Sequence, residues 1–90
     1  MTKAYHCVVT GKVQGVYFRA WIHDQAVALG LGGWTRNLDD GKVEVLLQGN
    51  EDNIAEMKKR LLVGSPLSQV SDLKCGWMDY DTKHDSFEIR

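Results

Sequence analysis

Residues 4–30, AYHCVVTGKVQGVYFRAWIHDQAVALG, contain the change of periodicity that decides the fold. Residues 4–13 are rich in β-branched side chains and alternate imperfectly between apolar and polar, which predicts a β-strand. From residue 18 to residue 29 apolar side chains recur at spacings of three and four, which predicts a helix, and Gly30 supplies its stop signal. A short glycine-bearing segment therefore carries the chain from a strand into the N-terminus of a helix.

The middle of the chain predicts a hairpin and a second helix. Residues 31–48 flank Asp40-Gly41, a pair typical of tight turns, and alternate in polarity beyond it, so a β-hairpin is expected there. The second helix has Asn50 as its N-cap, and Gly64 with Pro66 ends it. Its apolar side is expected to comprise Ile54, Met57, Leu61 and Leu62.

The end of the chain completes the order of elements. Residues 70–90 predict two strands with a polar turn at 81–85 between them. The order is then strand, helix, strand, strand, helix, strand, with one short strand added. It indicates an α+β fold, a ferredoxin-like sandwich in which two helices cover one face of a largely antiparallel, four- to five-stranded sheet. Because this fold hosts many unrelated functions, the function has to be inferred from the site.

Length and charge limit the class of protein. Ninety residues fit one domain, 1–90, and a core of this size is feasible without staples. The net charge of −1, with acidic and basic residues interspersed, argues against nucleic acid as a partner. No signal peptide is visible and no apolar run is long enough to cross a membrane, so we expect a cytoplasmic protein without membrane contact. A monomer is the default expectation.

The two cysteines, Cys7 and Cys75, lie 68 positions apart and lack the spacing of metal ligands. Each falls in a strand-like run, where cysteine packs as a small buried hydrophobe, and a cytoplasmic location favours this interpretation. A disulfide between them is the open alternative, because sequence alone does not give their distance.

The segment 11–19, Gly-Lys-Val-Gln-Gly-Val-Tyr-Phe-Arg, has the properties of an anion-binding loop. At a helix start the first N–H groups lack intrahelical partners and carry the positive end of the helix dipole. Gly15 permits a tight turn, and Arg19 is placed where its guanidinium can make two parallel bonds to phosphate oxygens. The pattern is neither a Walker A loop nor a dinucleotide fingerprint. By itself it fits an anion site and an ordinary glycine turn followed by a surface arginine about equally well.

Two motifs resemble the signatures of the acylphosphatase family. The first, Val9-x-Gly11-x-Val13-Gln14-Gly15-Val16-x-Phe18-Arg19, matches the family pattern at every defined position. The second, Gly33-Trp34-Thr35-Arg36-Asn37 followed by Gly41, Val43 and Gly49, departs only at Thr35, where the family usually carries Ala, Val or Cys. The resemblance extends to Gly64-Ser65-Pro66 and Phe87-Glu88-Ile89, so it covers essentially the whole chain.

The resemblance implies a hydrolase that cleaves acyl phosphates, which are small-molecule substrates, without a metal or other cofactor. It implies that Arg19 binds the phosphate and that Asn37 orients the attacking water. The phosphate would lie in a cradle of main-chain N–H groups that belong to Gln14, Gly15, Val16, Tyr17, Phe18 and Arg19. Tyr17 is also a candidate contact for the acyl part of the substrate. The physiological acyl phosphate and the final acceptor of the water proton stay open.

Two other functions are compatible with parts of the pattern, and a third, RNA binding, is disfavoured. A non-catalytic phosphate-binding module would use the same cradle but would not need Asn37. An acylphosphatase-like domain that serves carbamoyl transfer in a larger maturation protein is a second alternative, which a chain complete at 90 residues argues against. An RNA-binding domain would need aromatic residues within a basic, glycine-rich strand, and none is present.

Overall fold

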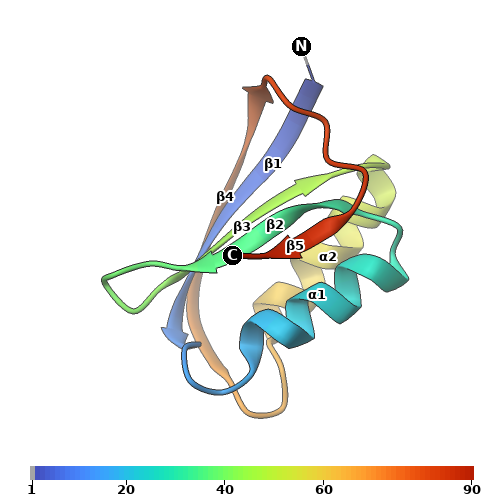
Figure 1. Cartoon of the computed structure of the whole chain (residues 1–90). Helices are drawn as coiled ribbons and strands as arrows, with labels where there is room; N and C mark the ends of the chain where they lie inside the picture. The colour runs from blue at the N-terminus through green and yellow to red at the C-terminus, as the bar shows by residue number, and fades with distance from the viewer. Residues whose placement is uncertain (1) are drawn as a thin grey trace.

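The computed structural model describes residues 2–90 and has the expected order of elements. Two helices and five strands follow one another in the chain (Figure 1): β1 (Thr2–Lys12), α1 (Phe18–Ala28), β2 (Gly32–Asn37), β3 (Val43–Gln48), α2 (Glu51–Val63), β4 (Gln69–Tyr80) and β5 (Phe87–Ile89). Both helices lie on the same face of the sheet, and the other face is left open (Figure 1). This is the ferredoxin-like α+β arrangement that the sequence predicts. Within the described residues, neither helix combines the length and the apolar character that a membrane crossing requires.

The sheet is largely antiparallel, as expected, and contains one parallel pair that the sequence did not predict. Its strand order is β4-β1-β3-β2-β5, and β1, β2, β3 and β4 pair antiparallel with their neighbours. β5 pairs parallel with β2 at the opposite edge from β4. The segment between β4 and β5, expected as a simple turn, therefore crosses the end of the sheet (Figure 1).

The main core lies between the sheet and the two helices. α1 contributes Phe18, Ile22 and Ala26, and α2 contributes Ile54, Met57 and Leu61, all of which are buried. Leu62 was expected on the same side, but 60% of its surface is exposed. At about 100° per residue, a helix that buries position 61 turns position 62 toward its flank, so only one of the two adjacent leucines reaches the core.

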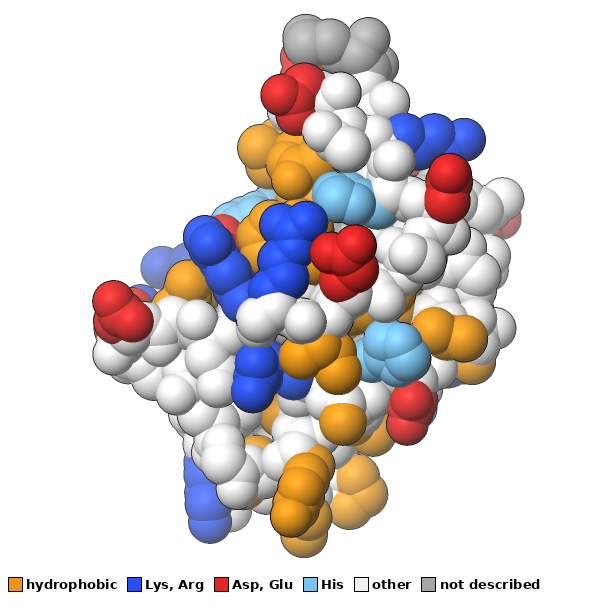
Figure 2. All heavy atoms as spheres, viewed as in Figure 1, with side chains coloured by type: hydrophobic (Ala, Val, Ile, Leu, Met, Phe, Trp, Pro, Cys, Tyr) orange, Lys and Arg blue, Asp and Glu red, His pale blue; other side chains and the backbone are white. Residues whose placement is uncertain are grey.

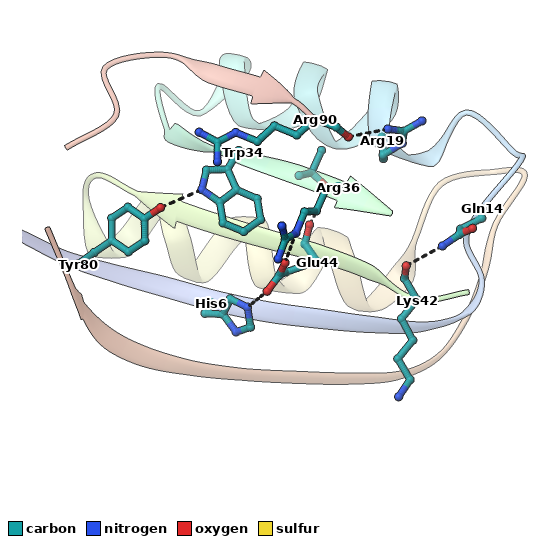
Figure 3. Close-up of polar contacts among 10 residues, drawn as sticks. His6, Gln14, Arg19, Trp34, Arg36, Lys42, Glu44, Tyr80 and Arg90 are labelled. Atoms are coloured by element: carbon teal, nitrogen blue, oxygen red, sulfur yellow. Dashed lines mark hydrogen bonds and ion pairs between the residues drawn. The ribbon is translucent and has the colours of Figure 1, made fainter. Parts of the chain in front are cut away.

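A smaller cluster lies on the open face of the sheet. Ala4, Trp34 and Leu46 are buried there, with Tyr80 packed against them. The indole Nε1–H of Trp34 donates to the Tyr80 hydroxyl over 3.2 Å. The guanidinium of Arg36 lies 5.2 Å and that of Arg90 5.1 Å from the ring centroid of Trp34 (Figure 3), within cation–π range.

A disulfide joins Cys7 to Cys75 across the neighbouring strands β1 and β4. The two residues are directly opposite one another in the antiparallel register, with Cα atoms 4.1 Å apart. Cys7 is fully buried, as expected of a small hydrophobe in a strand. Of the two possibilities that the sequence left open, the structure has the bridge.

Candidate active site

The C-terminal ends of three strands and the N-terminus of one helix lie together at one end of the sheet. β1 and β2 both pair antiparallel with β3, so they run parallel to one another. Their carboxyl ends, near Lys12 and Asn37, therefore lie at the same end of the sheet. β5 is parallel to β2, which brings Ile89 to this end of the sheet as well. α1 starts there, directly after the loop that leaves β1 (Figure 1). The topology therefore brings together the two motifs that the sequence separates.

The N-terminus of α1 has no cap from the protein. No side chain bonds to it, and its first turn contains no acidic residue. Within residues 2–90, the main-chain N–H groups of residues 14–20 donate to no protein acceptor, and the first helical bond runs from Trp21 N–H to Tyr17 O. α2 differs, because Asn50 Oδ1 accepts bonds from its first turn and Glu51 and Asp52 lie there. An uncapped helix N-terminus with free N–H groups attracts an anion.

The loop before α1 needs left-handed backbone at two positions. Gly15 has φ 72°, which glycine adopts without steric cost. Tyr17, the N-cap, has φ 57° and ψ 25°, and among the described residues it is the one non-glycine with a positive φ. Left-handed residues of this kind occur in anion-binding nests, in which successive N–H groups point to one side.

The side chain of Gln14 ties this loop to the β2–β3 turn. Its amide Nε2 donates to Leu38 O over 2.8 Å and to Lys42 O over 2.9 Å, and Figure 3 shows the bond to Lys42. Leu38 directly follows Asn37, so these bonds fix the distance between the loop and Asn37. The sequence assigned Gln14 only a main-chain role, and a polar side chain in a tight loop was the one available signal for this tether.

Arg19 is half-buried in the first turn of α1, and the end of β5 holds it in place. Its Nη1 donates to the main-chain oxygen of Arg90 over 2.8 Å (Figure 3). Arg90 is held in turn by its N–H, which donates to Thr35 O over 2.8 Å, and by its guanidinium on the Trp34 ring. Because a guanidinium has several N–H donors in a planar fork, those of Arg19 that do not bond Arg90 stay available for an anion. Sequence reasoning did not identify this support.

Most of the predicted site residues line a cavity of about 390 Å³. Gly15, Tyr17, Phe18, Arg19 and Asn37 line it, together with Val13, Ala20 and Ile89. Asn37 is exposed at the end of β2. Gln14 and Val16, also predicted as phosphate-binding residues, do not line the cavity: the Val16 side chain packs against the core and the Gln14 side chain is the tether.

The departure from the family motif at Thr35 is accommodated by a hydrogen bond. Thr35 is fully buried, and its Oγ1 donates to Glu44 O over 2.9 Å. A buried hydroxyl destabilises a protein when it has no partner, and this one has a main-chain acceptor on the adjacent strand. Threonine therefore fits where the family usually carries an apolar residue.

Electrostatics around the cavity favour an anion. Among the lining residues Arg19 carries the one formal charge. Glu44 lies instead on the open face, where burial opposes its ionisation but bonds from His6 Nε2 and Arg36 Nε outweigh the burial and hold its pKa below the ordinary value. In the β2–β3 turn the N–H of Lys42 donates to Asp40, and this bond lowers the pKa of that carboxyl.

Comparisons with known proteins agree on one family. The family model Acylphosphatase matches residues 5–89. The Acylphosphatase of Pelotomaculum thermopropionicum is 43% identical over 84 residues, which cover 93% of this chain and 91% of the relative. The crystal structure of acylphosphatase from Bacillus subtilis superposes with a TM-score of 0.92 at 35% identity and covers 98% of both chains.

A further solved structure contains a similar fold within a longer chain. The T. kodakarensis HypF structure matches with a TM-score of 0.87 at 28% identity, and the match covers 98% of this chain but 12% of HypF. By contrast, the family model and the Pelotomaculum relative match nearly end to end. On this basis the chain belongs to the acylphosphatase family.

Proposed function

We propose that this protein hydrolyses acyl phosphates to a carboxylate and inorganic phosphate without a metal. The observation that carries the proposal is that residues of the loop with free N–H groups, Arg19 and Asn37 all line one cavity. The first two fit a phosphate group, and the third fits a water molecule beside it.

In this proposal the phosphate binds in the cradle of residues 14–19. Its oxygens accept from the unpaired N–H groups and from the N–H groups of Arg19 that do not bond Arg90. Hydrogen bonds to a charged group contribute about 1.5–3 kcal/mol each, and two parallel bonds also fix orientation. The cradle thereby holds the phosphoryl group and stabilises the charge on its oxygens as the reaction proceeds.

Asn37 orients the attacking water, because its carbonyl accepts from water and its NH₂ donates. The water oxygen forms a bond to phosphorus, and the bond between phosphorus and the acyl oxygen breaks, with its electron pair going to the carboxylate. A carboxylate has a conjugate acid of pKa about 4, so it leaves as a stable anion at neutral pH. No strong general acid or Lewis acid is required for this leaving group. We propose a phosphate oxygen as the acceptor of the water proton.

The oligomeric state, the cellular location and the partners are also proposals. We propose one domain that acts as a monomer in the cytoplasm on a small molecule, with no nucleic acid or membrane as partner; the near-neutral, interspersed charge supports the last point. A disulfide such as Cys7–Cys75 is rare in that compartment. Light scattering tests the monomer, and cell fractionation with thiol titration tests the location.

The test is hydrolysis of benzoyl phosphate by the purified protein in the presence of EDTA. The parent should turn over rapidly and leave an alcohol phosphate ester nearly untouched, because an alkoxide is a far poorer leaving group. Arg19→Ala should reduce kcat/KM by about 10³-fold or more, from two charged hydrogen bonds at tenfold per about 1.4 kcal/mol. A folded parent that binds phosphate but does not turn over would instead be a binding module.

A further inference from the structure

The cavity is larger than a phosphate group requires. Its volume is about 390 Å³, whereas a phosphate displaces roughly three waters, or about 90 Å³. Several of the side chains that line the cavity have no part in the proposed phosphate and water sites. Since the leaving carboxylate stays covalently joined to the phosphate until the bond breaks, the rest of the substrate has to occupy the space that the phosphate leaves.

Two exposed apolar side chains line this cavity. Of the apolar lining residues, Val13 and Phe18 are 1% exposed and belong to the core. Tyr17 is 82% and Ile89 47% exposed, so both present apolar surface to a ligand. In Figure 2, hydrophobic side chains reach the surface at the end of the molecule where Figure 1 shows the loop before α1.

Stability gives no reason for a tyrosine at position 17. The left-handed backbone there is sterically unfavourable for a residue with a Cβ, and glycine or asparagine adopts it more readily. The ring buries little surface that would offset this, because 82% of the residue is exposed. Unfavourable backbone geometry of this kind persists at functional sites, where a ligand contact accounts for it.

The side chains that line the cavity favour one class of acyl group. An aromatic ring offers its face to another ring or to an apolar group, and Ile89 offers an aliphatic surface to the same cavity. The one charged lining residue is Arg19, which the phosphate engages, so a second carboxylate or an ammonium on the acyl group finds no partner. Burying such a group without a partner is unfavourable.

We infer that Tyr17 and Ile89 form the acyl subsite and give the enzyme a preference for acyl phosphates with an apolar, above all aromatic, acyl group. This inference rests on the proposed function, because it assigns the part of the substrate that the phosphate cradle does not hold. It makes Tyr17 a specificity-determining residue through its ring, in addition to the N–H that it contributes to the cradle.

The first arm of the test compares kcat/KM for benzoyl phosphate with kcat/KM for acetyl phosphate. Tyr17→Asn keeps a residue that tolerates left-handed backbone but removes the ring. The ratio of the two constants should fall about tenfold, the effect that one aromatic contact supports. Tyr17→Phe should keep the ratio, and Ile89→Thr should lower it by about threefold, for partial loss of aliphatic contact. Leu67→Asn, at an exposed apolar residue outside the cavity, should leave the ratio unchanged.

The second arm separates this inference from the proposed function. Benzoylphosphonate and acetylphosphonate carry the same acyl groups on a bond that the enzyme cannot hydrolyse, so calorimetry reports acyl preference without turnover. The parent should bind the benzoyl compound more tightly, and Tyr17→Asn should remove the difference. If the parent binds with this preference but hydrolyses neither acyl phosphate, the subsite stands and the proposed function fails.

Two results with Tyr17→Asn would overturn the subsite, as would one result with the parent. In one, Tyr17→Asn lowers kcat/KM for both substrates by the same factor, which means that residue 17 acts through the shape of the cradle. In the other, Tyr17→Asn lowers the free energy of unfolding well below that of the parent, which means that the ring packs for stability. Equal binding of both phosphonates by the parent excludes the subsite directly.

Discussion

The Gln14 tether predicts a loss of activity that exceeds its loss of stability. Gln14→Leu keeps the approximate size of the side chain and removes two donated bonds, to Leu38 O at 2.8 Å and to Lys42 O at 2.9 Å. At about 0.5–1.5 kcal/mol net for each bond, the pair contributes about 1–3 kcal/mol to folding. Both carbonyls keep another donor, since Gly41 N–H bonds to Leu38 O and Leu38 N–H to Lys42 O. The expected loss is therefore toward the lower end, about 1–2 kcal/mol.

The catalytic effect follows from what the tether joins. One end is in the cradle, and the other is the main chain directly after Asn37. Without the bonds, phosphate can still reach the cradle, but the water on Asn37 is no longer held in line with it. We expect kcat for benzoyl phosphate to fall about tenfold, which corresponds to about 1.4 kcal/mol, while the inhibition constant of inorganic phosphate changes much less.

Gln48→Leu is the matched control. Gln48 also uses its side-chain amide twice on main chain, donating to Thr82 O over 2.8 Å and accepting from His84 N–H over 2.7 Å, but at the other end of β3. Urea unfolding should show a comparable loss of stability in both variants, and turnover well below the melting temperature should fall only in Gln14→Leu. Equal kcat values for the two variants would refute the tether as a positioning device.

Four further outcomes are expected. Arg19→Lys should be severely impaired in kcat/KM, because an ammonium does not reproduce the two-bond fork of a guanidinium. Near-normal turnover would exclude two-bond binding of the phosphate by Arg19. Asn37→Ala should lower kcat with phosphate affinity largely kept, as steady-state inhibition by phosphate can show; a matching loss of phosphate affinity means that Asn37 holds the anion. Because the pKa of the Glu44 carboxyl is lowered in the folded state, its contribution to stability is present above the ordinary value of about 4.5 and is lost as the pH falls through the folded value. Glu44→Gln should therefore be less stable than the parent at pH 7 and should lose less stability than the parent between pH 7 and pH 3, as urea unfolding at the two pH values can show. Reducing the Cys7–Cys75 bridge, which spans 68 residues, should lower the free energy of unfolding by up to about 4 kcal/mol. Urea unfolding with and without dithiothreitol measures this loss, and a variant with alanine at both positions should not respond to the reductant.

The elements whose signals are local were predictable from the sequence. The second helix begins at Asn50 because that side chain satisfies N–H groups two and three residues away, and such a cap is visible in the sequence. The hairpin around Asp40-Gly41 is equally local, and Gly41 has the positive φ that its turn requires. Arg19 and Asn37 were identified as site residues by resemblance, and both line the cavity.

The features that the sequence did not predict depend on contacts between distant segments. Local periodicity shows that residues 87–89 form a strand but not which sheet edge is free to pair with it, so the parallel pairing with β2 was missed. The support of Arg19 by Arg90 joins residues 71 positions apart. The disulfide likewise depends on the register that sets Cys7 opposite Cys75. Each needs the strand order before it can be inferred.

The strand order also explains how so few groups can form a site. β3 lies between the parallel strands β1 and β2, so its first residues separate the loop after β1 from Asn37 at the end of β2. Gln14 spans this separation by bonding the main chain on both sides of the β2–β3 turn. Phosphoryl transfer through a loose transition state needs positioning more than it needs a proton donor, so rigid strand and helix ends can supply most of what the reaction requires. Substitutions that loosen this end of the sheet should therefore affect turnover directly. Substitutions on the open face that leave Arg90 in place, such as Glu44→Gln, should act chiefly through stability.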